Sequence, residues 1–564
     1  MSRTFLYASL LIIASIALSN SHAVEIEGVI PAHSAVYVAV RDIPAIWDWV
    51  KESPFWQAFL SSNELGDGIR EIETGISLMK QSLGVDLRVL VEIFCRRLAY
   101  VQVYPDDAGS IIPIFQDIPP VVIADVGAPE MAPEIISKVE QLLQSNERYE
   151  IRPQAGKYLS VPFGTFRDMA GGPTLIYAFL DSLFVLAWEQ DDFEAIVDAY
   201  LGEAPSLLQD PKFNKVSARV SADNEVIIYA NVEALWSTGI WRAELGVLMQ
   251  TLGVRDIRSI LWTTNLLDPA RDQEMYMYTG DSDGLLISLF AEPRILYSPH
   301  LIPAVDADIF FAVHFGDLKT AWENLKNSVR ITLGAENYDQ MQKGISEFEH
   351  DTGVSLEDDI LSSLTGEVGF ALTFPEVMKP LQGTEFLLHD GFTIFCGVKD
   401  RERCAMSMQR FLSAMRAELR QTEYKGVEIY EIPSPGGSEY PYGYTFAGDM
   451  LVFGSFQKLE ALINEAYPLA ASEGFAGIRS QLPQQMSLLY YVNLEKMQEL
   501  MLKAMPEIQD DMTSETLGSI GGTMNYDGEG LKFRSIGTQG KNWLETIGGI
   551  MDFLLVRKRF LGGT

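Results

Sequence analysis

Two stretches of the chain share one pattern and decide the fold. Residues 31–53 read PAHSAVYVAVRDIPAIWDWVKES, and residues 303–328 read PAVDADIFFAVHFGDLKTAWENLKNS. Each begins with Pro-Ala and a short apolar run, and then has an Asp, an Ile or Leu, and a Trp four positions further on. A run rich in β-branched and aromatic residues predicts a buried strand. Because the second stretch restarts the first, the sequence predicts a duplicated fold.

Asp42 and Asp317 stand just before the helical part of each stretch. A short carboxylate there accepts a hydrogen bond from a free backbone N–H, so both residues are predicted N-caps. The apolar residues that follow recur at i, i+3, i+4 and i+7, which predicts amphipathic helices with Trp47 and Trp322 turned inward. The two Trp side chains could instead form a stacking platform for a sugar, but helical spacing favours core packing.

Two longer blocks recur in the same order. Residues 177–200 match residues 444–467, and residues 213–235 match residues 475–497 without a gap. The first block predicts a β-hairpin followed by a helix, which belongs to an α+β unit and not to a parallel crossover.

Turn residues predict further elements in both halves. Alternating residues from Tyr149 and from Tyr424 predict two hairpins. Gly84 and Gly353 each open a Gly-Val-x-Leu motif after a predicted helix, where a glycine commonly forms the C-cap. A helix over residues 64–83 is predicted to precede the first of them.

These patterns predict an α+β protein with two tandem, structurally similar lobes, each a mainly antiparallel sheet with packed helices. A chain of 564 residues is too long for one hydrophobic core. The predicted lobes span residues 24–290 and 303–540. Residues 291–302 contain prolines and no helical period, which predicts a linker that lies on the surface as a strap.

The first 23 residues resemble a secretory signal peptide. Arg3 precedes an apolar run, and Ser21 and Ala23 are the small residues that a signal peptidase prefers. The apolar run is shorter than the roughly 20 residues that span a bilayer. We therefore expect cleavage near Ala23 and an exported chain, periplasmic or secreted; an uncleaved anchor is the alternative.

Residues 541–564 form an apolar, helix-like tail that ends in Arg557, Lys558 and Arg559. Such a helix could lie on a membrane surface. It could equally dock on its own domain, with its cations next to the negative end of the helix dipole. We favour docking, and this tail is the one place where membrane contact is expected.

The charge balance argues against a nucleic-acid partner. The chain has 43 Lys and Arg against 77 Asp and Glu, for a net charge of −34. An acidic surface repels phosphate backbones, so we expect no nucleic-acid partner.

Three cysteines, Cys95, Cys396 and Cys404, cannot all pair with one another. Cys95 and Cys396 lie in apolar runs, which predicts buried thiols. Cys396 and Cys404 could form a disulfide only if the fold brings them together.

The recurring Tyr-x-Asn-x-Glu motif ends at Glu233 in the first half and at Glu495 in the second. Asn231 and Glu233 could belong to a site, but an Asn at the end of a strand is a natural N-cap for the next helix. The acidic turns 281–284 and 527–530 share Asp and Gly with calcium loops, but they lack the other ligand positions of such loops. We read them as corresponding hairpin turns.

The densest polar cluster contains Glu347, Glu349, His350 and Asp351. Its place on the polar side and at the end of a helix predicts a solvated face. If a metal ion did bind, His350 with Glu347 or Asp351 would be the first ligands to mutate. We find no nucleophile elbow, zinc motif, phosphate loop or dinucleotide fingerprint, so the sequence assigns no catalytic, cofactor-binding or metal-binding residue.

The order of these motifs resembles an exported bacterial family, the domain of unknown function 3352. The motifs are Pro-Ala before an apolar strand, Asp-Ile/Leu-x-x-x-Trp, Gly-Val-x-Leu, and Tyr-x-Asn-x-Glu late in each half. The resemblance covers nearly the whole mature chain as two tandem copies. It implies an exported, non-cytosolic protein, and because the family has no assigned catalytic residues, it carries over no site.

The sequence favours a non-enzymatic binding or scaffolding module of the bacterial envelope, with an unknown envelope or extracellular protein as its partner. The alternative is a carrier of an apolar ligand held in or between the lobes, given the high aromatic and aliphatic content. A hydrolase is the third hypothesis. It would require a polar cluster that lines a cleft in only one lobe.

Overall fold

The computed structural model describes the chain in ordered segments that belong to two compact units. The described residues are 25–52, 97–103, 120–126, 149–169, 173–237, 249–250, 252–265, 273–280, 284–374, 391–415, 420–432, 442–464, 467–504 and 518–538. Of the described residues, those from 25 to 237 and from 258 to 278 belong to the first unit, and those from 249 to 257 and from 279 to 538 belong to the second. Helices and antiparallel strands occur in both, which confirms the α+β class.

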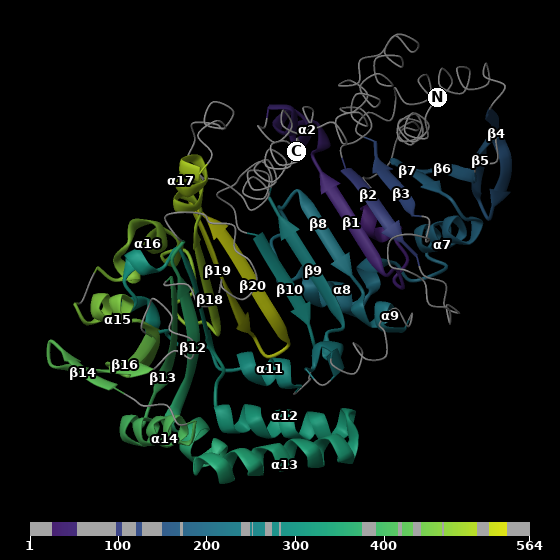
Figure 1. Cartoon of the computed structure of the whole chain (residues 1–564). Helices are drawn as coiled ribbons and strands as arrows, with labels where there is room; N and C mark the ends of the chain where they lie inside the picture. The colour runs from purple at the N-terminus through teal and green to yellow at the C-terminus, as the bar shows by residue number, and fades with distance from the viewer. Residues whose placement is uncertain are drawn as a thin grey trace, which may run out of the picture. The chain divides into compact units, whose positions relative to one another are not determined.

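The first unit is built on one antiparallel sheet (Figure 1). Its described strands pair in the order β4, β5, β6, β7, β3, β2, β1, β8, β9, β10. Their bounds are β1 Val36–Arg41, β2 Arg97–Gln102, β3 Val121–Asp125, β4 Tyr149–Tyr158, β5 Val161–Asp168, β6 Thr174–Leu180, β7 Leu183–Ala187, β8 Val226–Ala230, β9 Ser259–Thr264 and β10 Gln273–Tyr278. The helices include α2 Ile43–Glu52, α7 Gln190–Leu201, α8 Pro211–Ser217 and α9 Val232–Ser237.

The second unit repeats this order of pairing. Its strands follow one another as β14, β15, β16, β17, β13, β12, β11, β18, β19, β20. Their bounds are β11 Ile309–His314, β12 Leu364–Leu372, β13 Phe392–Val398, β14 Arg420–Tyr424, β15 Val427–Ile432, β16 Tyr442–Ala447, β17 Met450–Ser455, β18 Leu488–Asn493, β19 Ser519–Tyr526 and β20 Gly530–Gly537. The helices include α11 Leu285–Phe290, α12 Leu318–Thr332, α13 Gly334–Thr352, α14 Arg401–Ala414, α15 Phe456–Ile463, α16 Glu473–Arg479 and α17 Leu494–Ala504.

Each core is centred on three aromatic rings in the same arrangement. In the first unit, Phe213 of α8 meets the edges of Tyr37 and Tyr229 at centroid distances of 6.5 and 5.2 Å. In the second unit, Phe475 of α16 meets Phe310 and Tyr491 at 6.3 and 5.4 Å. All six rings are buried, so the aromatic residues that recur in the matched blocks pack one helix on the sheet of their own unit.

The recurring Pro-Ala pair has a structural reason. The amide of Ala32 donates to the carbonyl of Pro205 at 3.0 Å, and the amide of Ala304 donates to that of Tyr467 at 2.8 Å. These bonds hold the segment that enters each unit against a later loop of that unit.

The predicted N-caps are confirmed. An Oδ of Asp317 accepts a hydrogen bond from the amide of Thr320 at 3.1 Å, and that of Asp42 accepts one from Ala45 at 3.4 Å. Trp322 is half-buried and donates its indole N–H to Glu357 at 3.1 Å, so it packs beside the turn after α13 and not in the centre of the core. The Trp47 side chain lies outside the described residues.

The predicted hairpins are also confirmed. They are β4–β5 and β14–β15, and the matched blocks supply β6–β7 and β16–β17. The turn residues Asp181 and Lys425 have positive φ values of 55° and 49°, which two-residue hairpins require. Gly353 has a φ of 67° and forms the C-cap of α13, as predicted.

Residues 291–302 lie as a strap on the second unit. Arg294 forms an isolated bridge with Met486, and Leu296 is 5 % exposed while its neighbour Ile295 is 63 % exposed. This segment is therefore packed against its unit and is not a free tether. The predicted domain boundaries themselves stay predictions.

One predicted correspondence is wrong. The turn 527–530 connects β19 to β20, whose counterparts are β9 and β10, so its equivalent is the connection between Thr264 and Gln273. Gly284 instead precedes α11. The two turns were matched wrongly because both combine Asp with Gly. The predicted signal peptide, the helix over residues 64–83, Gly84, Cys95 and the tail lie outside the described residues. Within those residues, no helix is long and apolar enough to cross a membrane.

Candidate functional site

One face of the sheet in the second unit is uncharged over six strands. Residues directly opposite one another in antiparallel strands point to the same face. The registers place three rows on this face, across β13, β12, β11, β18, β19 and β20: Phe392, Leu372, Ile309, Val492, Ile520 and Gly537; Ile394, Phe370, Phe311, Tyr490, Gly522 and Ser535; Cys396, Val368, Val313, Leu488, Met524 and Phe533. We call these positions the uncharged face.

Aromatic rings stack along the uncharged face. Phe370 lies between Phe311 and Phe392, with centroid distances of 5.6 and 5.7 Å and interplanar angles of 21° and 26°. Tyr490 and Phe533 stack at 5.9 Å with an interplanar angle of 1°. These side chains are half-buried, and Ile394, which stands opposite Phe370 on β13, is 42 % exposed. The face therefore offers flat, partly accessible apolar surface.

The opposite face of the same strands is the hydrophobic core. Phe310, Phe395 and Leu489 alternate with the residues of the uncharged face, and they are buried under helices such as α15 and α16, which lie on that side of the sheet (Figure 1). The uncharged face is thus the second apolar face of a sheet whose first face already carries the core.

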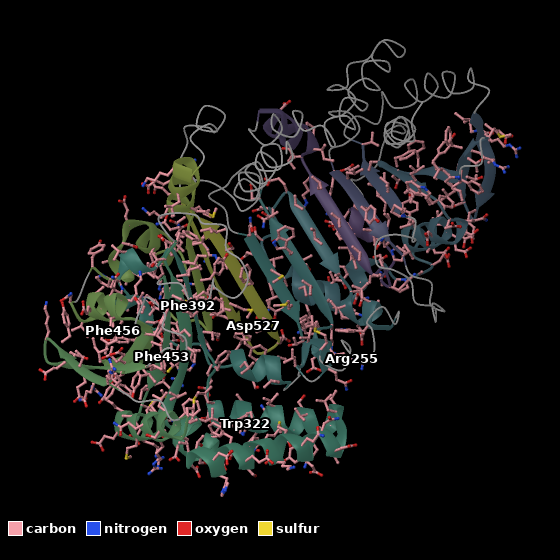
Figure 2. The ribbon with its side chains drawn as sticks, viewed as in Figure 1. Arg255, Trp322, Phe392, Phe453, Phe456 and Asp527 are labelled. Carbon is pink, nitrogen blue, oxygen red and sulfur yellow. The ribbon has the colours of Figure 1, made fainter. Side chains whose placement is uncertain are left out.

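A second, smaller cluster covers one end of the sheet on the same side as the uncharged face. Helix α14 packs there through Cys404 and Leu412 against residues of β13, β16 and β17. Phe453 of β17 lies at the edge of this cluster, and Figure 2 shows it near Phe392 of the neighbouring strand β13. Phe311, Phe370 and Phe392 belong to neither of the two buried clusters.

The few polar groups on the uncharged face are kept neutral. The Tyr490 hydroxyl donates to Ser535 at 2.5 Å, and burial raises the pKa of Tyr490 to about 12. Burial raises the pKa of Cys396 to about 12 as well, with a smaller contribution from Cys404. A protonated thiol and phenol supply neither a nucleophile nor a base near neutral pH. The face can hold an apolar molecule, but it carries no group for acid–base chemistry.

Glycine shapes one part of this surface. A Cβ atom at Gly522 would come within 2.6 Å of the Tyr490 ring and within 2.3 Å of the Arg534 carbonyl oxygen. Only glycine therefore lets the Tyr490 ring lie flat across β19 and stack on Phe533.

The first unit has an equivalent row. Val122, Tyr100, Val38, Ile228, Trp262 and Met275 lie opposite one another across β3, β2, β1, β8, β9 and β10, and all are half-buried. This row also contains no charged residue. Neither face was predicted from the sequence, although the central strands, such as IFFAV and VYVAV, carry apolar residues at both odd and even positions.

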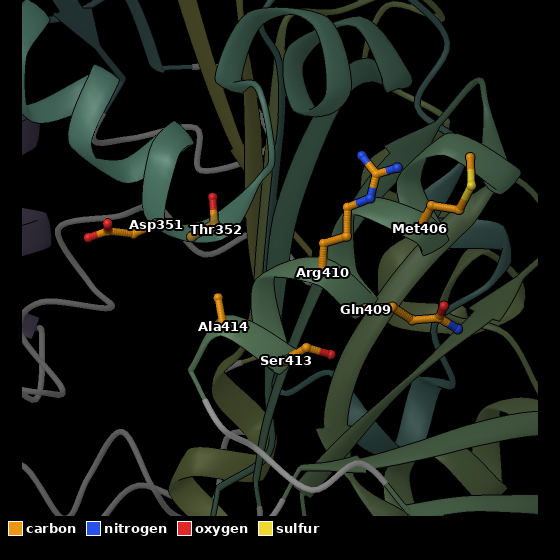
Figure 3. A pocket seen from close by; sticks show the side chains of 7 residues that line it. All are labelled: Asp351, Thr352, Met406, Gln409, Arg410, Ser413 and Ala414. Atoms are coloured by element: carbon orange, nitrogen blue, oxygen red, sulfur yellow. The ribbon is translucent and has the colours of Figure 1, made fainter.

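A separate hollow of about 590 Å³ lies between the end of α13 and one face of α14 (Figure 3). The face of α14 presents residues at i, i+3, i+4, i+7 and i+8: Met406, Gln409, Arg410, Ser413 and Ala414. The Arg410 guanidinium donates to the carbonyl of Gly353 at 3.5 Å, and Met406 is 51 % exposed. The hollow is open, and the Thr352 hydroxyl in its lining donates to the Phe348 carbonyl at 2.7 Å.

The polar cluster at the end of α13 is mostly solvated. His350 and Asp351 are exposed, and Glu347 pairs with Lys343 at 3.6 Å. Glu349 differs, because its Oε1 accepts hydrogen bonds from the Leu356 amide at 2.9 Å and the Ser355 hydroxyl at 3.0 Å. Glu349 therefore orders the turn after α13. No group of three or more His, Cys, Asp or Glu among the described residues could hold a metal ion.

Asn231 and Asn493 are N-caps. Their Oδ1 atoms accept from the amides of Ala234 at 3.2 Å and Lys496 at 3.1 Å. In the first unit alone, Lys212 also donates to Asn231 at 3.3 Å, and its ammonium lies 3.0 Å from Glu233.

This polar group has no counterpart at Gly474, the position that matches Lys212. Tyr229, whose hydroxyl lies 3.5 Å from Asp210, is fully buried, and Asp210 is 5 % exposed. A substrate cannot reach these two residues. The side chains of Lys212 and Glu233 stay partly exposed, and their ion pair connects α8 to α9.

Asp527 forms an ordinary turn. Its Oδ1 accepts hydrogen bonds from the amides of Glu529 at 3.0 Å and Gly530 at 3.1 Å. The carboxylate thus holds its own hairpin. Residues 281–283 of the other acidic turn lie outside the described residues.

Cys396 and Cys404 are free thiols in the same apolar cluster. Burial raises the pKa of both, and a hydrogen bond with Ser363 partly opposes this for Cys404. Protonated, enclosed thiols of this kind are structural.

Residues 385–546 match the model of a family described as a protein of unknown function (DUF3352). The matched segment lies within the second unit, and it includes β13 to β20 and therefore much of the uncharged face. A single copy is matched, and the description specifies no activity. No curated protein and no solved structure matches the chain.

Proposed function

We propose that this protein is an exported, non-enzymatic binding module of the bacterial envelope, and that its ligand is apolar. The observation that carries the proposal is the uncharged face of the second unit. Its half-buried rings, Phe311, Phe370 and Phe392, stack on the side of the sheet away from the main core. When a ligand covers apolar surface that water contacts, the free energy of binding becomes more favourable by roughly 25 cal/mol per Å².

The chemistry of this face selects the ligand class. No charged side chain stands at any position of the uncharged face, so nothing there would pair with a phosphate, a carboxylate or an ammonium group. Parallel rings on adjacent strands present a long flat surface, which suits acyl or isoprenoid chains better than a compact polar metabolite. The proposed ligand is therefore the hydrocarbon part of a lipid.

Duplication fits this role. The two units share one pairing order and one arrangement of core rings, and each has an uncharged row. We infer that an ancestral α+β unit was copied, and that the recurring Tyr, Phe and Trp residues are retained mainly for packing. Two such faces would let one chain hold two hydrocarbon segments.

Native mass spectrometry of protein purified without detergent tests the proposal. Wild-type protein should carry lipid adducts, and Ile394→Glu should lose them because a carboxylate would stand among the rings. Ile331→Glu on α12 is the matched control, since Ile331 is 76 % exposed and lies off the uncharged face. Unliganded wild-type protein that also fails to bind a fluorescent acyl-chain probe would exclude this function, as would full retention of adducts by Ile394→Glu.

A second candidate function is docking of an envelope protein in the hollow between α13 and α14. The exposed thioether of Met406 in its lining favours it, with Met415 also exposed just after α14, because flexible methionines suit adaptable protein surfaces. Capture of one discrete envelope partner by wild-type protein, and its loss in Met406→Glu, would support this role.

A further inference from the structure

Strand β14 forms an outer edge of the sheet in the second unit (Figure 1). It pairs with β15 from Arg420 opposite Glu431 to Tyr424 opposite Val427, and no other described strand pairs with it. Arg420, Gln421, Thr422 and Glu423 are all exposed. An edge of this kind presents a row of free backbone N–H and C=O groups, which another strand can use.

The turn fixes which residues present those groups. Lys425 and Gly426 form a two-residue turn with φ values of 49° and 81°. In such a hairpin the flanking pair, Tyr424 and Val427, exchanges backbone hydrogen bonds. Because hydrogen-bonding direction alternates along a strand, the backbone groups of Thr422 also bond to β15. The backbone groups of Gln421 and Glu423 point away from β15, toward the free edge.

The corresponding edge of the first unit is protected. Strand β4 contains Pro153, and its register with β5 shifts between Arg152 and Gly156. A proline and an irregular register are the features by which natural sheets block edge pairing. Strand β14 contains no proline, and its register with β15 is continuous. The difference between the two units therefore leaves one edge open.

We propose that β14 pairs antiparallel with β14 of a second copy of this chain, with Thr422 opposite Thr422 at the two-fold axis. This two-fold axis is perpendicular to the sheet, so each side chain of one β14 meets side chains from the same sheet face of the other β14. The outward groups of Gln421 and Glu423 then bond to each other across the axis. The side chains agree with this register, because Gln421 faces a carboxylate and Arg420 faces the ring of Tyr424.

The neighbouring registers are less favourable. Centring the pair on Glu423 places that carboxylate against its own copy, which is repulsive. Centring it on Gln421 places Arg420 opposite Thr422, so Arg420 and Glu423 both lose the partners that they have in the register centred on Thr422. Gln421 already donates to Glu428 at 2.6 Å, and its second amide hydrogen is available for the pairing.

A five-residue strand gives a small interface, so the dimer should be transient. Interfaces below about 1,200 Å² are typical of weak encounters. We expect a dissociation constant in the micromolar to millimolar range. The proposal does not depend on the ligand of the uncharged face.

Sedimentation velocity of the full chain over a range of concentrations tests the pairing. Wild-type protein should form a dimer as the concentration rises. Gln421→Pro removes an outward N–H and leaves the inward bonds of Thr422 intact, so it should remain monomeric with an unchanged melting temperature. Gln421→Ala keeps the backbone N–H and should dimerise like wild type. A monomeric wild type, or dimerisation of Gln421→Pro, would overturn the proposal.

Cross-linking tests the register. In a chain with Cys95→Ser, a Thr422→Cys substitution places two thiols at a non-hydrogen-bonded pair about 4.5 Å apart at Cα. Oxidation with diamide should then give a covalent dimer. Glu423→Cys in the same chain should cross-link several-fold less, because its copy is not directly opposite. Equal or stronger cross-linking of Glu423→Cys would exclude this register.

Discussion

Oε1 of Glu367 accepts a hydrogen bond from the backbone amide of Ser298 at 2.8 Å, and Oε2 accepts one from the amide of Tyr297 at 3.0 Å. Glu367 stands on β12, and Ser298 belongs to the strap that enters the second unit. In the first unit, the matching position on β2 is Arg97, which pairs with Glu27 of the entering segment. The same position thus anchors the entering segment in both units, with opposite charge.

Replacing Glu367 should destabilise the second unit. Glu367→Ala leaves the buried amide of Ser298 without its acceptor, which costs about 1–3 kcal/mol, and it also removes the acceptor of the partly buried Tyr297 amide. Urea unfolding should show this loss, and Glu367→Gln should lose less because one acceptor oxygen remains. Glu292→Gln is the control, since Glu292 is an exposed residue of the strap. Unchanged stability of Glu367→Ala would mean that the strap is held by its apolar contacts alone.

The ion pair in the first unit should make stability fall in acid. Burial by itself raises the pKa of Glu27, but the charge and hydrogen bonds of Arg97 outweigh it and lower the pKa below the ordinary 4.5. The folded state therefore binds fewer protons than the unfolded state below about pH 5, and this part of the stability is lost as pH falls through the lowered pKa.

Variants at this pair give the measurement. Arg97→Ala leaves a buried carboxylate unpaired and should cost about 3–5 kcal/mol at pH 7. The double variant Glu27→Gln/Arg97→Met should cost less and should show a flatter acid limb in urea unfolding between pH 3 and pH 6. An acid limb identical to wild type would show that other carboxyl groups control it.

The pKa of Asp192 gives the opposite pH dependence. Burial, followed by the charges of Glu189 and Asp191, raises the pKa of Asp192 to about 7. The native state then binds a proton that the unfolded state releases near pH 4, so stability falls as pH rises from about 4 to about 7. Asp192→Asn should remove this loss and stabilise the protein at pH 8 by about 1 kcal/mol, an amount that allows for solvent screening.

A pair of unfolding curves checks this expectation. Wild type and Asp192→Asn should differ in urea midpoint at pH 8 and converge near pH 4. Glu203→Gln, at an exposed position after α7, changes the net charge equally and should leave the curve unchanged. A constant difference between wild type and Asp192→Asn at all pH values would contradict the assignment.

The central ring of each unit should be equally important for its own core. Phe475→Ala and Phe213→Ala should each cost about 3–5 kcal/mol, because each ring is buried between two other rings. Ile331→Ala, at an exposed position, should have no measurable effect. Thermal unfolding of the three variants provides the comparison, and a change below about 1 kcal/mol in either Phe variant would show that its three-ring cluster is not a core centre.

The thiols of Cys396 and Cys404 should resist alkylation in the native protein. Burial raises the pKa of both, so both form less of the reactive thiolate than an ordinary cysteine does. Iodoacetamide followed by mass spectrometry should modify these two cysteines in urea and leave them free in buffer. A native disulfide between them, seen as a loss of two mass units, would contradict the free thiols.

The sequence predicted most of the local structure. Asp42 and Asp317 cap their helices, Gly353 ends α13, and the hairpins at Lys425 and Asp181 have the expected turns, because caps and turns depend on a few neighbouring residues. The sequence did not predict the candidate site. Phe311, Phe370 and Phe392 lie far apart in the chain, and only the strand registers bring their rings together.

The amino-acid sequence by itself determined the class of the fold and the elements of each unit, because apolar spacing, capping residues and turn glycines act over a few positions. Tertiary structure alone decided which of two apolar sides of β11 became core and which became the uncharged face. Alternation sends Phe310 and Phe311 to opposite sides, and only the helices that pack on Phe310 distinguish them. The same holds for β14, whose open edge follows from which strands pair and not from its own five residues.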